Sequence, residues 1–370
     1  MDPKNRLNHD ETRVNQTISS VRARPHRLTD SFVTMAHGSG GKASAALVEQ
    51  VFFEAFASDR LTDGDSAVLP LAQLGLDAAS TGGSLAMSTD SYVVNPIFFP
   101  GGSIGELAIN GTVNDLAVAG ARPLLITAAF VLEEGLPIDT LRTIAAAMRN
   151  AADAAGVAVV AGDTKVVPKG SCDQLYITTA GVGYVPADRR LGYKQVQPGD
   201  RVILSGPIAD HGMAVMMARG DLALTAPIES DTRAVNSLVE ALVAAAPGVR
   251  WMRDATRGGV ATVMNELARG SGMGVALHDD RIPVRDLTRG ACDVLGIDPL
   301  YVANEGTFLA VVPEGQAQAA TQALIDAGAP QAAIIGQIIP EPAKSVVLVT
   351  GFGGTRMVDM LVGDPLPRIC

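Results

Sequence analysis

From Phe32 onward, the chain alternates short runs of apolar and β-branched residues with longer segments whose apolar residues recur every three or four positions. Short runs of this kind are typical of strands, and the second spacing is typical of amphipathic helices. In residues 137–155, for example, Leu141, Ile144 and Met148 share one helix face. The pattern predicts strands over residues 84–94, 125–132, 157–165 and 175–185, with helices over 43–56, 104–120 and 137–155.

A second unit of the same kind follows the turn at residues 197–200. It begins with an apolar strand and alternates in the same way to about residue 349, without a repeat of fixed length. The predicted strands cover 201–205, 275–277, 301–312, 333–339 and 346–349, and the predicted helices lie near 211–219, 232–246, 258–269 and 314–327.

These two units predict a two-domain α/β (α+β) protein. Residues 1–32 mix basic and acidic side chains and contain no apolar signal-peptide segment, so we expect a flexible extension there. The last residues carry two prolines, Pro365 and Pro367, which disfavour helix and central strand. We expect a glycine-rich segment and helix over 33–60, domains over 61–196 and 197–360, and a flexible tail over 361–370.

Charge and composition exclude several classes of protein. The net charge is −10, which argues against binding nucleic acid through a basic face. The longest apolar run, residues 124–132, is far shorter than the roughly 20 residues that span a bilayer. The cysteines are Cys172, Cys292 and Cys370, and their spacing suggests neither a disulfide framework nor a zinc site. We therefore expect a soluble protein of the reducing cytoplasm.

Several aspartates interrupt apolar segments at small-residue turns. Taken singly, each is a helix cap or a turn residue. Taken together, they could hold a magnesium–nucleotide complex, because Mg²⁺ prefers one or two carboxylates together with phosphate oxygens. The candidates are Asp65, Asp90, Asp163 and Asp254, together with the pair Asn114-Asp115 inside an apolar helix.

Three further places could carry chemistry. The segment His37-Gly38-Ser39-Gly40-Gly41-Lys42 offers backbone N–H groups and a lysine to a phosphate, or is a flexible linker before a helix. Lys165 follows Asp163 by two residues and could neutralise phosphate or, when desolvated, act as a base. Glu305 interrupts an apolar region and is either functional or part of a strand bulge beside Gly306.

The final residue is the most unusual feature. Cys172 and Cys292 are expected to be buried and inert, as free cysteines commonly are. Cys370 instead ends a proline-containing tail that could extend about 25 Å at about 3.1 Å per residue. An exposed thiol is open to oxidation and exchange, so the alternative of an accidental terminal cysteine is the weaker one.

Seven motifs together resemble the [NiFe]-hydrogenase maturation factors of the HypE family, over about residues 33–370. They are His37-Gly38-Ser39-Gly40-Gly41, Ser88-Thr89-Asp90-Ser91-Tyr92-Val93, Phe98-Phe99-Pro100-Gly101-Gly102, Gly162-Asp163-Thr164-Lys165-Val166-Val167, Asp254-Ala255-Thr256-Arg257-Gly258-Gly259, Ala303-Asn304-Glu305-Gly306 and Pro367-Arg368-Ile369-Cys370. The terminal motif separates this family from its relatives, the aminoimidazole ribonucleotide synthetases, selenophosphate synthetases and thiamine-monophosphate kinases.

The resemblance implies an aminoimidazole ribonucleotide synthetase-like fold and a homodimer whose N-terminal domains pair into a barrel-like core. It implies ATP and Mg²⁺ bound between the domains, with the N-terminal domain as the ATP-binding one. It also implies a carbamoyl group loaded on Cys370 by the carbamoyltransferase HypF, and the ATP-dependent dehydration of that group to a thiocyanate. The cyanide would pass to iron on the HypC–HypD complex. No nucleic acid or membrane partner is implied.

The same resemblance assigns roles to residues. Cys370, Lys165 and Glu305 would be catalytic, with Lys165 and Glu305 removing protons. The nucleotide would contact Gly40, Gly41, Lys42, Asp90, Asn114, Asp163, Thr164 and Asp254, and the metal would contact Asp65, Asp90, Asp163 and Asp254. Two alternatives remain open: a small-molecule kinase or synthetase of the same superfamily, and a non-enzymatic thiol carrier.

Overall fold

The computed structural model describes residues 27–38, 42–56, 74, 76, 82–220 and 226–360. The first domain is built on a four-stranded sheet with the strand order β1-β6-β4-β5. Its central pair is antiparallel, and β4 and β5 are parallel. The bounds are β1 (Ser84–Tyr92), β4 (Arg122–Glu133), β5 (Ala158–Val167) and β6 (Leu175–Val185).

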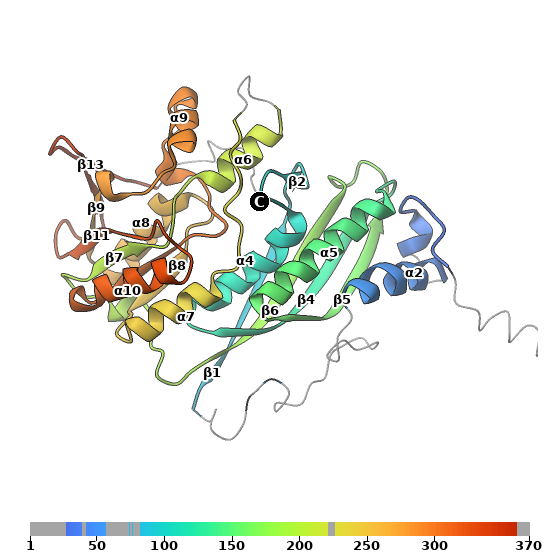
Figure 1. Ribbon diagram of the computed structural model, residues 1–370, viewed down its shortest axis with the longest axis horizontal. Coiled ribbons are helices and arrows are strands. Elements are labelled where there is room, and N and C mark those ends of the chain that lie inside the picture. Colours follow the sequence, from blue (N-terminus) through green and yellow to red (C-terminus); the bar gives the residue numbers. More distant parts are fainter. Residues whose placement is uncertain are drawn as a thin grey trace, which may run out of the picture.

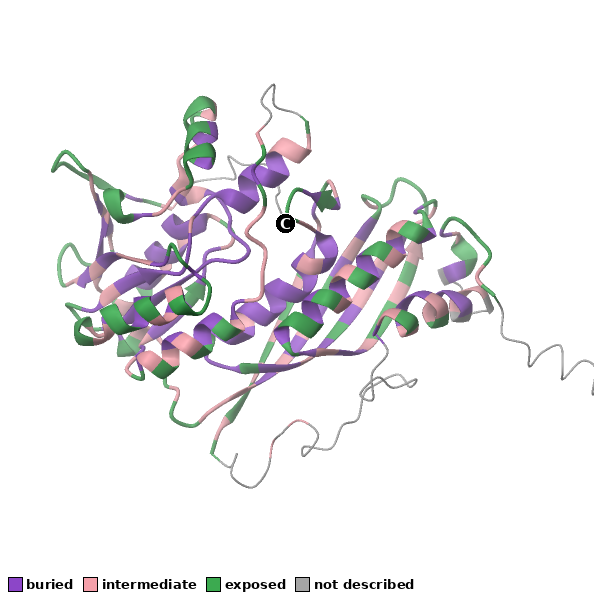
Figure 2. Ribbon diagram, in the orientation of Figure 1, coloured by how far each residue is buried: buried purple, intermediate pink, exposed green. Residues whose placement is uncertain are grey.

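Two helices, α4 (Ile104–Val118) and α5 (Ile138–Ala155), cover one face of this sheet (Figure 1). Ser103 caps α4 by accepting the N–H of Gly105 at 3.1 Å. Helix α4 is buried along most of its length because it also packs against the second domain (Figure 2). Close packing requires Gly111, where a Cβ atom would lie 2.3 Å from the hydroxyl of Tyr92.

No helix of the described residues covers the other face of the four-stranded sheet, which we call the open face (Figure 1). The exposed side chains Leu85 and Met87 of β1 alternate with residues directed toward α4. Within the described chain no sheet closes into a barrel, so the expected barrel-like core is not formed by one copy.

A short helical segment packs beside β5 (Figure 1). It consists of α2 (Lys42–Leu47), the π-helical turn η3 (Val48–Phe53) and α3 (Glu54–Phe56), preceded by the 3₁₀ turn η2 (Met35–Gly38). Phe52 anchors the segment against Phe130 of β4, with ring centroids 4.5 Å apart. Part of the expected flexible extension is also bound to this helical segment, since the N–H of Leu28 donates to Gln50 Oε1 at 3.0 Å.

The second domain contains a seven-stranded sheet with the order β13-β12-β9-β11-β7-β10-β8. One face packs on α7 (Asn236–Ala245) and α10 (Glu314–Asp326), and the other on α8 (Gly259–Ser271). Helices α6 (Asp210–Ala218) and α9 (Asp286–Leu295) lie toward the first domain's core cluster. The strands are β7 (Arg201–Leu204), β8 (Trp251–Asp254), β9 (Gly274–His278), β10 (Phe308–Val312), β11 (Ala333–Ile339), β12 (Val346–Val349) and β13 (Thr355–Met357).

Residues 226–235, which we call the crossing segment, run between the domains and bond to both. On the first domain, the N–H of Ser230 donates to the carbonyl of Pro100 at 2.8 Å, next to the two-residue strands β2 (Phe98–Phe99) and β3 (Gly102–Ser103). On the second, Arg233 Nε donates to the carbonyl of Gly306 at 3.0 Å. The crossing segment therefore holds the two domains together along α4.

The long predicted elements are confirmed, and the structure corrects several shorter ones. The helix expected from Thr232 begins at Asn236, because the backbone of residues 233 and 235 bonds to Asn114 instead. The strand expected from Tyr301 begins at Phe308, so Glu305 lies in a loop and not in a strand bulge. Strands β8 and β13 and helix α9 were not predicted.

In the described ranges, no helix combines the length and the apolar character that crossing a membrane requires.

Candidate active site

Helix α4 presents two polar side chains toward the junction of the two domains. Asp115 accepts a hydrogen bond from the hydroxyl of Ser88 at 2.6 Å. Asn114, one residue earlier, is buried between the domains. Both residues were candidates from the sequence, as a pair that interrupts an apolar helix, but only Asn114 was expected to contact the nucleotide, and Asp115 was given no role.

Four carboxylates share this junction, and we call them the acidic group: Asp90, Asp115, Asp254 and Glu305. Burial raises the pKa of Asp254 to about 7, and the negative charges of Asp115 and Asp90 add to the shift. Burial also raises the pKa of Asp115, with a further contribution from Asp90. Burial first, then Asp90 and Glu305, raise the pKa of Tyr92. The acidic group is thus electrostatically coupled.

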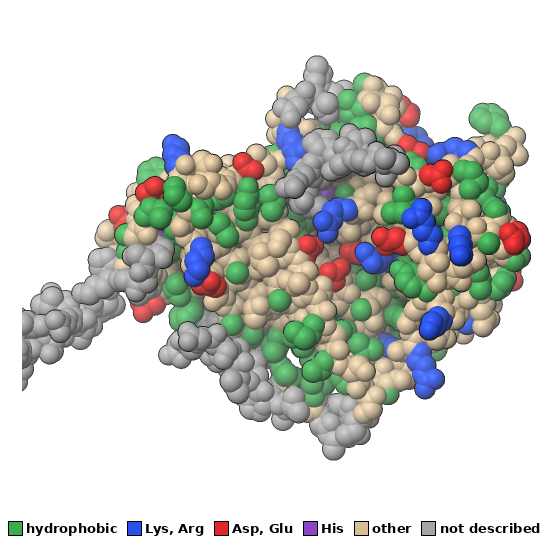
Figure 3. All heavy atoms as spheres, turned by 180° about the vertical axis from the view of Figure 1, so that it is seen from behind, with side chains coloured by type: hydrophobic (Ala, Val, Ile, Leu, Met, Phe, Trp, Pro, Cys, Tyr) green, Lys and Arg blue, Asp and Glu red, His purple; other side chains and the backbone are tan. Residues whose placement is uncertain are grey.

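Positive groups lie beside the acidic group. Arg253 and Arg257 lower the pKa of Asp115 against the effect of burial. Both arginines are exposed, and Arg257 stands just before α8, whose first backbone N–H groups are those of a helix N-terminus. Figure 3 shows acidic side chains gathered near the middle of the molecule, with basic side chains around them. Such a mixture suits a ligand that carries both phosphate oxygens and a cation.

Glu305 is held in this place by its main chain. Its carbonyl accepts from Asn114 Nδ2 at 3.1 Å, and its N–H donates to Asp231 at 2.9 Å. The preceding residue, Asn304, is fully buried and bonds to the backbone of Ala209 and of Ala255, which follows Asp254. These contacts connect the loop that carries Glu305 to both Asp254 and α4.

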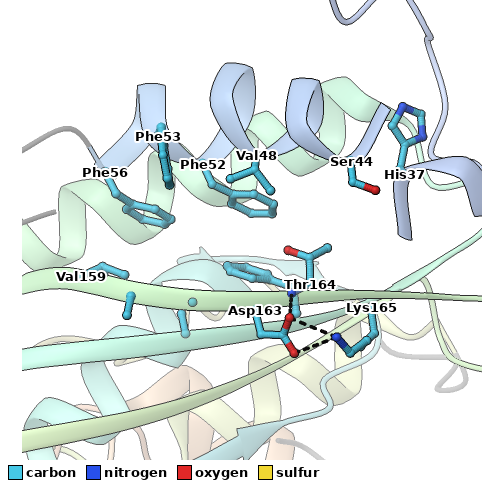
Figure 4. Close-up of a pocket in the computed structure, with 14 residues that line it drawn as sticks. His37, Ser44, Val48, Phe52, Phe53, Phe56, Val159, Asp163, Thr164 and Lys165 are labelled. Carbon is cyan, nitrogen blue, oxygen red and sulfur yellow. Dashed lines mark hydrogen bonds and ion pairs between the residues drawn. The ribbon is translucent and has the colours of Figure 1, made fainter. Parts of the chain in front are cut away.

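A second group of predicted residues lies on β5. Lys165 forms an ion pair with Asp163 at 3.0 Å, and this hydrogen bond is the main cause that lowers the pKa of Asp163. A cavity of about 300 Å³ lies between β5 and the helical segment. Figure 4 shows Phe52 and Phe56 on the helical side of the strand, with Asp163 and Lys165 on its other side. Asp163, Thr164 and Lys165 all contribute to the lining of this cavity.

The two groups lie apart within one chain. β1 and β5 are opposite edges of the sheet, so three interstrand spacings, roughly 14 Å, separate the strand of Asp90 from the strand of Lys165. Lys165 also lies three residues beyond Gly162, the residue of β5 that is level with Asp90. They also occupy opposite faces: Asp90 pairs with Thr179, which is buried under α4, whereas Lys165 pairs with the half-exposed Val131 on the open face. One copy therefore does not bring Lys165 to Glu305.

The donor set at the junction fits a magnesium–nucleotide complex better than a bare ion. Among the described residues, no three acidic, histidine or cysteine side chains converge closely enough to hold a metal ion. Mg²⁺ is usually held by one or two carboxylates, with phosphate oxygens and waters completing its shell. Mutually repelling carboxylates whose pKa values are raised, such as Asp254 and Asp115, fit that mode of binding.

Four predicted site residues lie outside the described part of the chain: Gly40, Gly41, Asp65 and Cys370. Lys42 is the first residue of α2. Cys292 is buried as expected, and burial raises the pKa of its thiol to about 11. Cys172 is only partly buried, less than expected, and burial raises its pKa as well.

Family models cover most of the chain. Residues 63–185 match the N-terminal domain of the AIR synthase related proteins, and residues 197–349 match the C-terminal domain of the same proteins. A thiamine-monophosphate kinase from Stenotrophomonas maltophilia K279a, 18% identical, has the same fold with a TM-score of 0.61 over 85% of this chain and 96% of its own.

Closer relatives span almost the whole chain. The chain is 49% identical to carbamoyl dehydratase HypE of Rhodobacter capsulatus, over 93% of this chain and 99% of the relative. It is 43% identical to carbamoyl dehydratase HypE of Escherichia coli strain K12, over 91% and 99%. A crystal structure of HypE in complex with ATP superposes with a TM-score of 0.85 at 42% identity, covering 91% of this chain and 99% of that one. The chain belongs to the HypE family of hydrogenase maturation proteins.

Proposed function

We propose that this protein dehydrates a carbamoyl group carried on its own Cys370, in an ATP-dependent reaction that supplies cyanide for the iron centre of [NiFe]-hydrogenase. The observation that carries the proposal is the acidic group at the domain junction, in which Glu305, Asp90 and Asp115 all act on the same residue, Tyr92. Asp254 is coupled to Asp115 and Asp90 there. The relatives named carbamoyl dehydratase support the reaction class. A HypE solved with ATP supports the nucleotide.

The overall reaction converts S–C(=O)–NH₂ and ATP into S–C≡N, ADP and phosphate. Hydroxide is a poor leaving group, so transfer of the γ-phosphoryl group to the amide oxygen would turn that oxygen into part of a phosphate. Removal of both nitrogen protons then forms the C≡N bond as the C–O bond breaks and phosphate leaves. The protein's task is to position the groups, to neutralise charge and to accept protons.

Binding of the triphosphate would fall to groups at the junction. In our proposal, one or two carboxylates from among Asp90, Asp115 and Asp254 would hold Mg²⁺ together with phosphate oxygens, and the ion would neutralise negative charge there. Arg257 and the N-terminus of α8 face anionic oxygens, because the N-terminal N–H groups of a helix attract them. Binding to Gly40, Gly41, Lys42 and Asn114 remains part of the proposal, as does a metal contact of Asp65.

In our proposal, Glu305 and Lys165 remove the protons from the nitrogen of the carbamoyl group. Glu305 is buried, and its main chain is held on both sides, so its carboxylate would be presented from a fixed loop. Lys165 is exposed in the single chain and pairs with Asp163. A closed site would remove water from Lys165, and desolvation disfavours a charged lysine, which makes it a better base.

A homodimer would bring these residues together. We propose that the open faces of two N-terminal sheets pack against each other, with edge strand β1 of each copy beside β5 of the other. The exposed apolar residues Leu85 and Met87 on β1 favour such burial. This pairing would close eight strands into a barrel-like core and would bring β5 of one copy, with Asp163, Thr164 and Lys165, beside β1 of the other, the strand that carries Asp90.

Partners follow from the chemistry. A solved HypE–HypF complex, with a TM-score of 0.73 at 42% identity over 85% of this chain and 100% of that one, supports the carbamoyltransferase HypF as the donor. The product would need an iron-bearing acceptor, for which we propose the HypC–HypD complex, in the cytoplasm.

Intact mass of the protein tests the proposal. After incubation with HypF and its substrates, the wild type should gain one carbamoyl group, and Mg–ATP should then remove the mass of one water. Cys370→Ser should show neither change, because a hydroxyl is far less nucleophilic than a thiol. Cys172→Ser is the matched control and should behave like the wild type. The proposal is wrong if Cys370→Ser shows both shifts, or if the group maps to Cys172 or Cys292.

A further inference from the structure

A single carboxylate in the crossing segment receives two consecutive backbone N–H groups from the loop that carries Glu305. The N–H of Glu305 lies 2.9 Å from Asp231 Oδ1, and the N–H of Gly306 lies 3.0 Å from Asp231 Oδ2. Burial raises the pKa of Asp231, whereas these N–H groups, the side chain of Thr307 and Arg233 favour its ionised form. The carboxylate is thus engaged on both oxygens.

The main chains of the two segments also touch. A Cβ atom on Gly306 would lie 1.8 Å from the carbonyl oxygen of Asp231, so only glycine fits there. Arg233 Nε donates to the carbonyl of Gly306 from the same side. The carbonyl of Glu305, which belongs to the peptide group before Gly306, accepts a hydrogen bond from Asn114 of the first domain. The peptide groups on both sides of Glu305 are therefore held by different elements.

We propose that Asp231 is a positioning residue for Glu305, setting the direction in which the glutamate side chain leaves the loop. This inference rests on the proposed function, in which Glu305 accepts a proton. The carboxylate carbon of a glutamate lies three bonds from its Cα atom, so a small rotation of the backbone moves the carboxylate by a large distance. Fixing the two N–H groups with one carboxylate reduces that freedom and keeps Glu305 in reach of the substrate nitrogen.

A purely structural role for Asp231 predicts a different result. Loss of a structural contact lowers stability and weakens all activities of the site together, including ATP binding. Loss of a positioning contact slows the proton-transfer step and leaves nucleotide affinity unchanged. The two roles are therefore separated by kcat for loss of water and KM for ATP, measured on the full-length protein with Cys370 already carbamoylated.

The experiment uses Asp231→Asn and Asp231→Ala. The asparagine keeps the shape and one acceptor, and the alanine removes both. We expect kcat to fall by about tenfold for Asp231→Asn and by about a hundredfold for Asp231→Ala, since each lost hydrogen bond is worth about one factor of ten. KM for ATP should stay within about twofold in both. Glu229→Gln, an exposed residue of the same segment, is the matched control and should behave like the wild type.

A double variant decides whether Asp231 acts through Glu305. In the Glu305→Gln background, adding Asp231→Asn should change the residual rate by less than about twofold, because residues that act as one unit are not additive. An equal fall in both backgrounds overturns the inference, and so does an unchanged kcat in Asp231→Asn. If the wild type itself does not lose water with Mg–ATP, the proposed function fails instead, so the two failures are distinguishable.

Discussion

The side-chain amide of Asn114 lies 3.1 Å from the carbonyl oxygen of Glu305, although 191 positions separate these residues in the chain. The same amide donates to the carbonyl of Arg233 at 3.0 Å, and its oxygen accepts the N–H of Val235 at 2.8 Å. One asparagine of the first domain thereby joins the crossing segment and the Glu305 loop. The hydrogen bonds that join the two domains therefore also support Glu305, the proposed base.

Asn114→Ala should therefore destabilise the protein strongly. The change removes the Asn114 partner of two buried backbone groups, the carbonyl of Glu305 and the N–H of Val235, and of the part-buried carbonyl of Arg233. We expect a loss of about 3 kcal/mol in the free energy of unfolding. Urea unfolding followed by circular dichroism measures it.

The matched control is Asn236→Ala, which removes only the half-buried bond from Asn236 Nδ2 to the carbonyl of Ala155 at 2.9 Å. It should cost about 1 kcal/mol. Equal losses in the two variants would contradict the joining role of Asn114.

Asp254→Asn should make the protein more stable at alkaline pH. Because burial raises the pKa of Asp254 to about 7 in the folded state, the folded protein binds this proton more tightly than the unfolded chain does. The resulting stabilisation is complete below about pH 4 and is lost as the pH rises to about 7. Asparagine removes the cost of a buried charge, so we expect a gain of at least about 1.4 kcal/mol at pH 8 and a smaller gain at pH 5.

Urea unfolding at the two pH values checks this expectation, with the exposed Asp280→Asn as control. ATP-dependent loss of water should disappear in Asp254→Asn at both values. A larger gain in the free energy of unfolding at pH 5 than at pH 8 would contradict this prediction.

Mixing two inactive variants should restore activity if the site is shared between copies. Lys165→Ala and Glu305→Ala should each accept the carbamoyl group and fail to dehydrate it. In mixed dimers, one of the two sites would combine an intact Lys165 with an intact Glu305. Random mixing therefore predicts about a quarter of the wild-type activity.

Lys165→Ala mixed with itself after the same treatment is the control and should stay inactive. Absence of recovery, in a sample where native mass spectrometry detects mixed dimers, rules out the shared site and leaves the rest of the proposed function intact.

Asp115→Asn should raise the magnesium requirement of ATP turnover. Asp115 belongs to the acidic group, and within the described chain its side chain accepts a hydrogen bond only from the Ser88 hydroxyl, so its carboxylate remains available to a cation. We expect activity at fixed Mg–ATP to fall by about a hundredfold, with the fold retained. Titration of activity with Mg²⁺ measures it, and Asp139→Asn on the exposed side of α5 is the control. An unchanged magnesium curve removes Asp115 from the metal site.

The longest patterned segments could be predicted from the sequence. The helix expected over 137–155 is α5, and the strand expected over 175–185 is β6, because many residues repeat the same period there. Strand β8, Trp251–Asp254, was missed because two apolar residues followed by the charged Arg253 and Asp254 do not form an apolar run. The start of α7 was misplaced because hydrogen bonds to Asn114 hold residues 233–235 in another conformation.

The candidate site could likewise be predicted only in part from the sequence. The sequence by itself identified Asp90, Asp163, Lys165, Asp254 and Glu305 as candidates, because charged residues beside small ones in apolar segments are visible locally. It did not separate them into two groups, which depends on the pairing of Asp90 with Thr179 and of Lys165 with Val131. Nor did it find Asp231, whose partners are about 75 positions away. Strand register and long-range hydrogen bonds leave no local period, so only the folded chain reveals them.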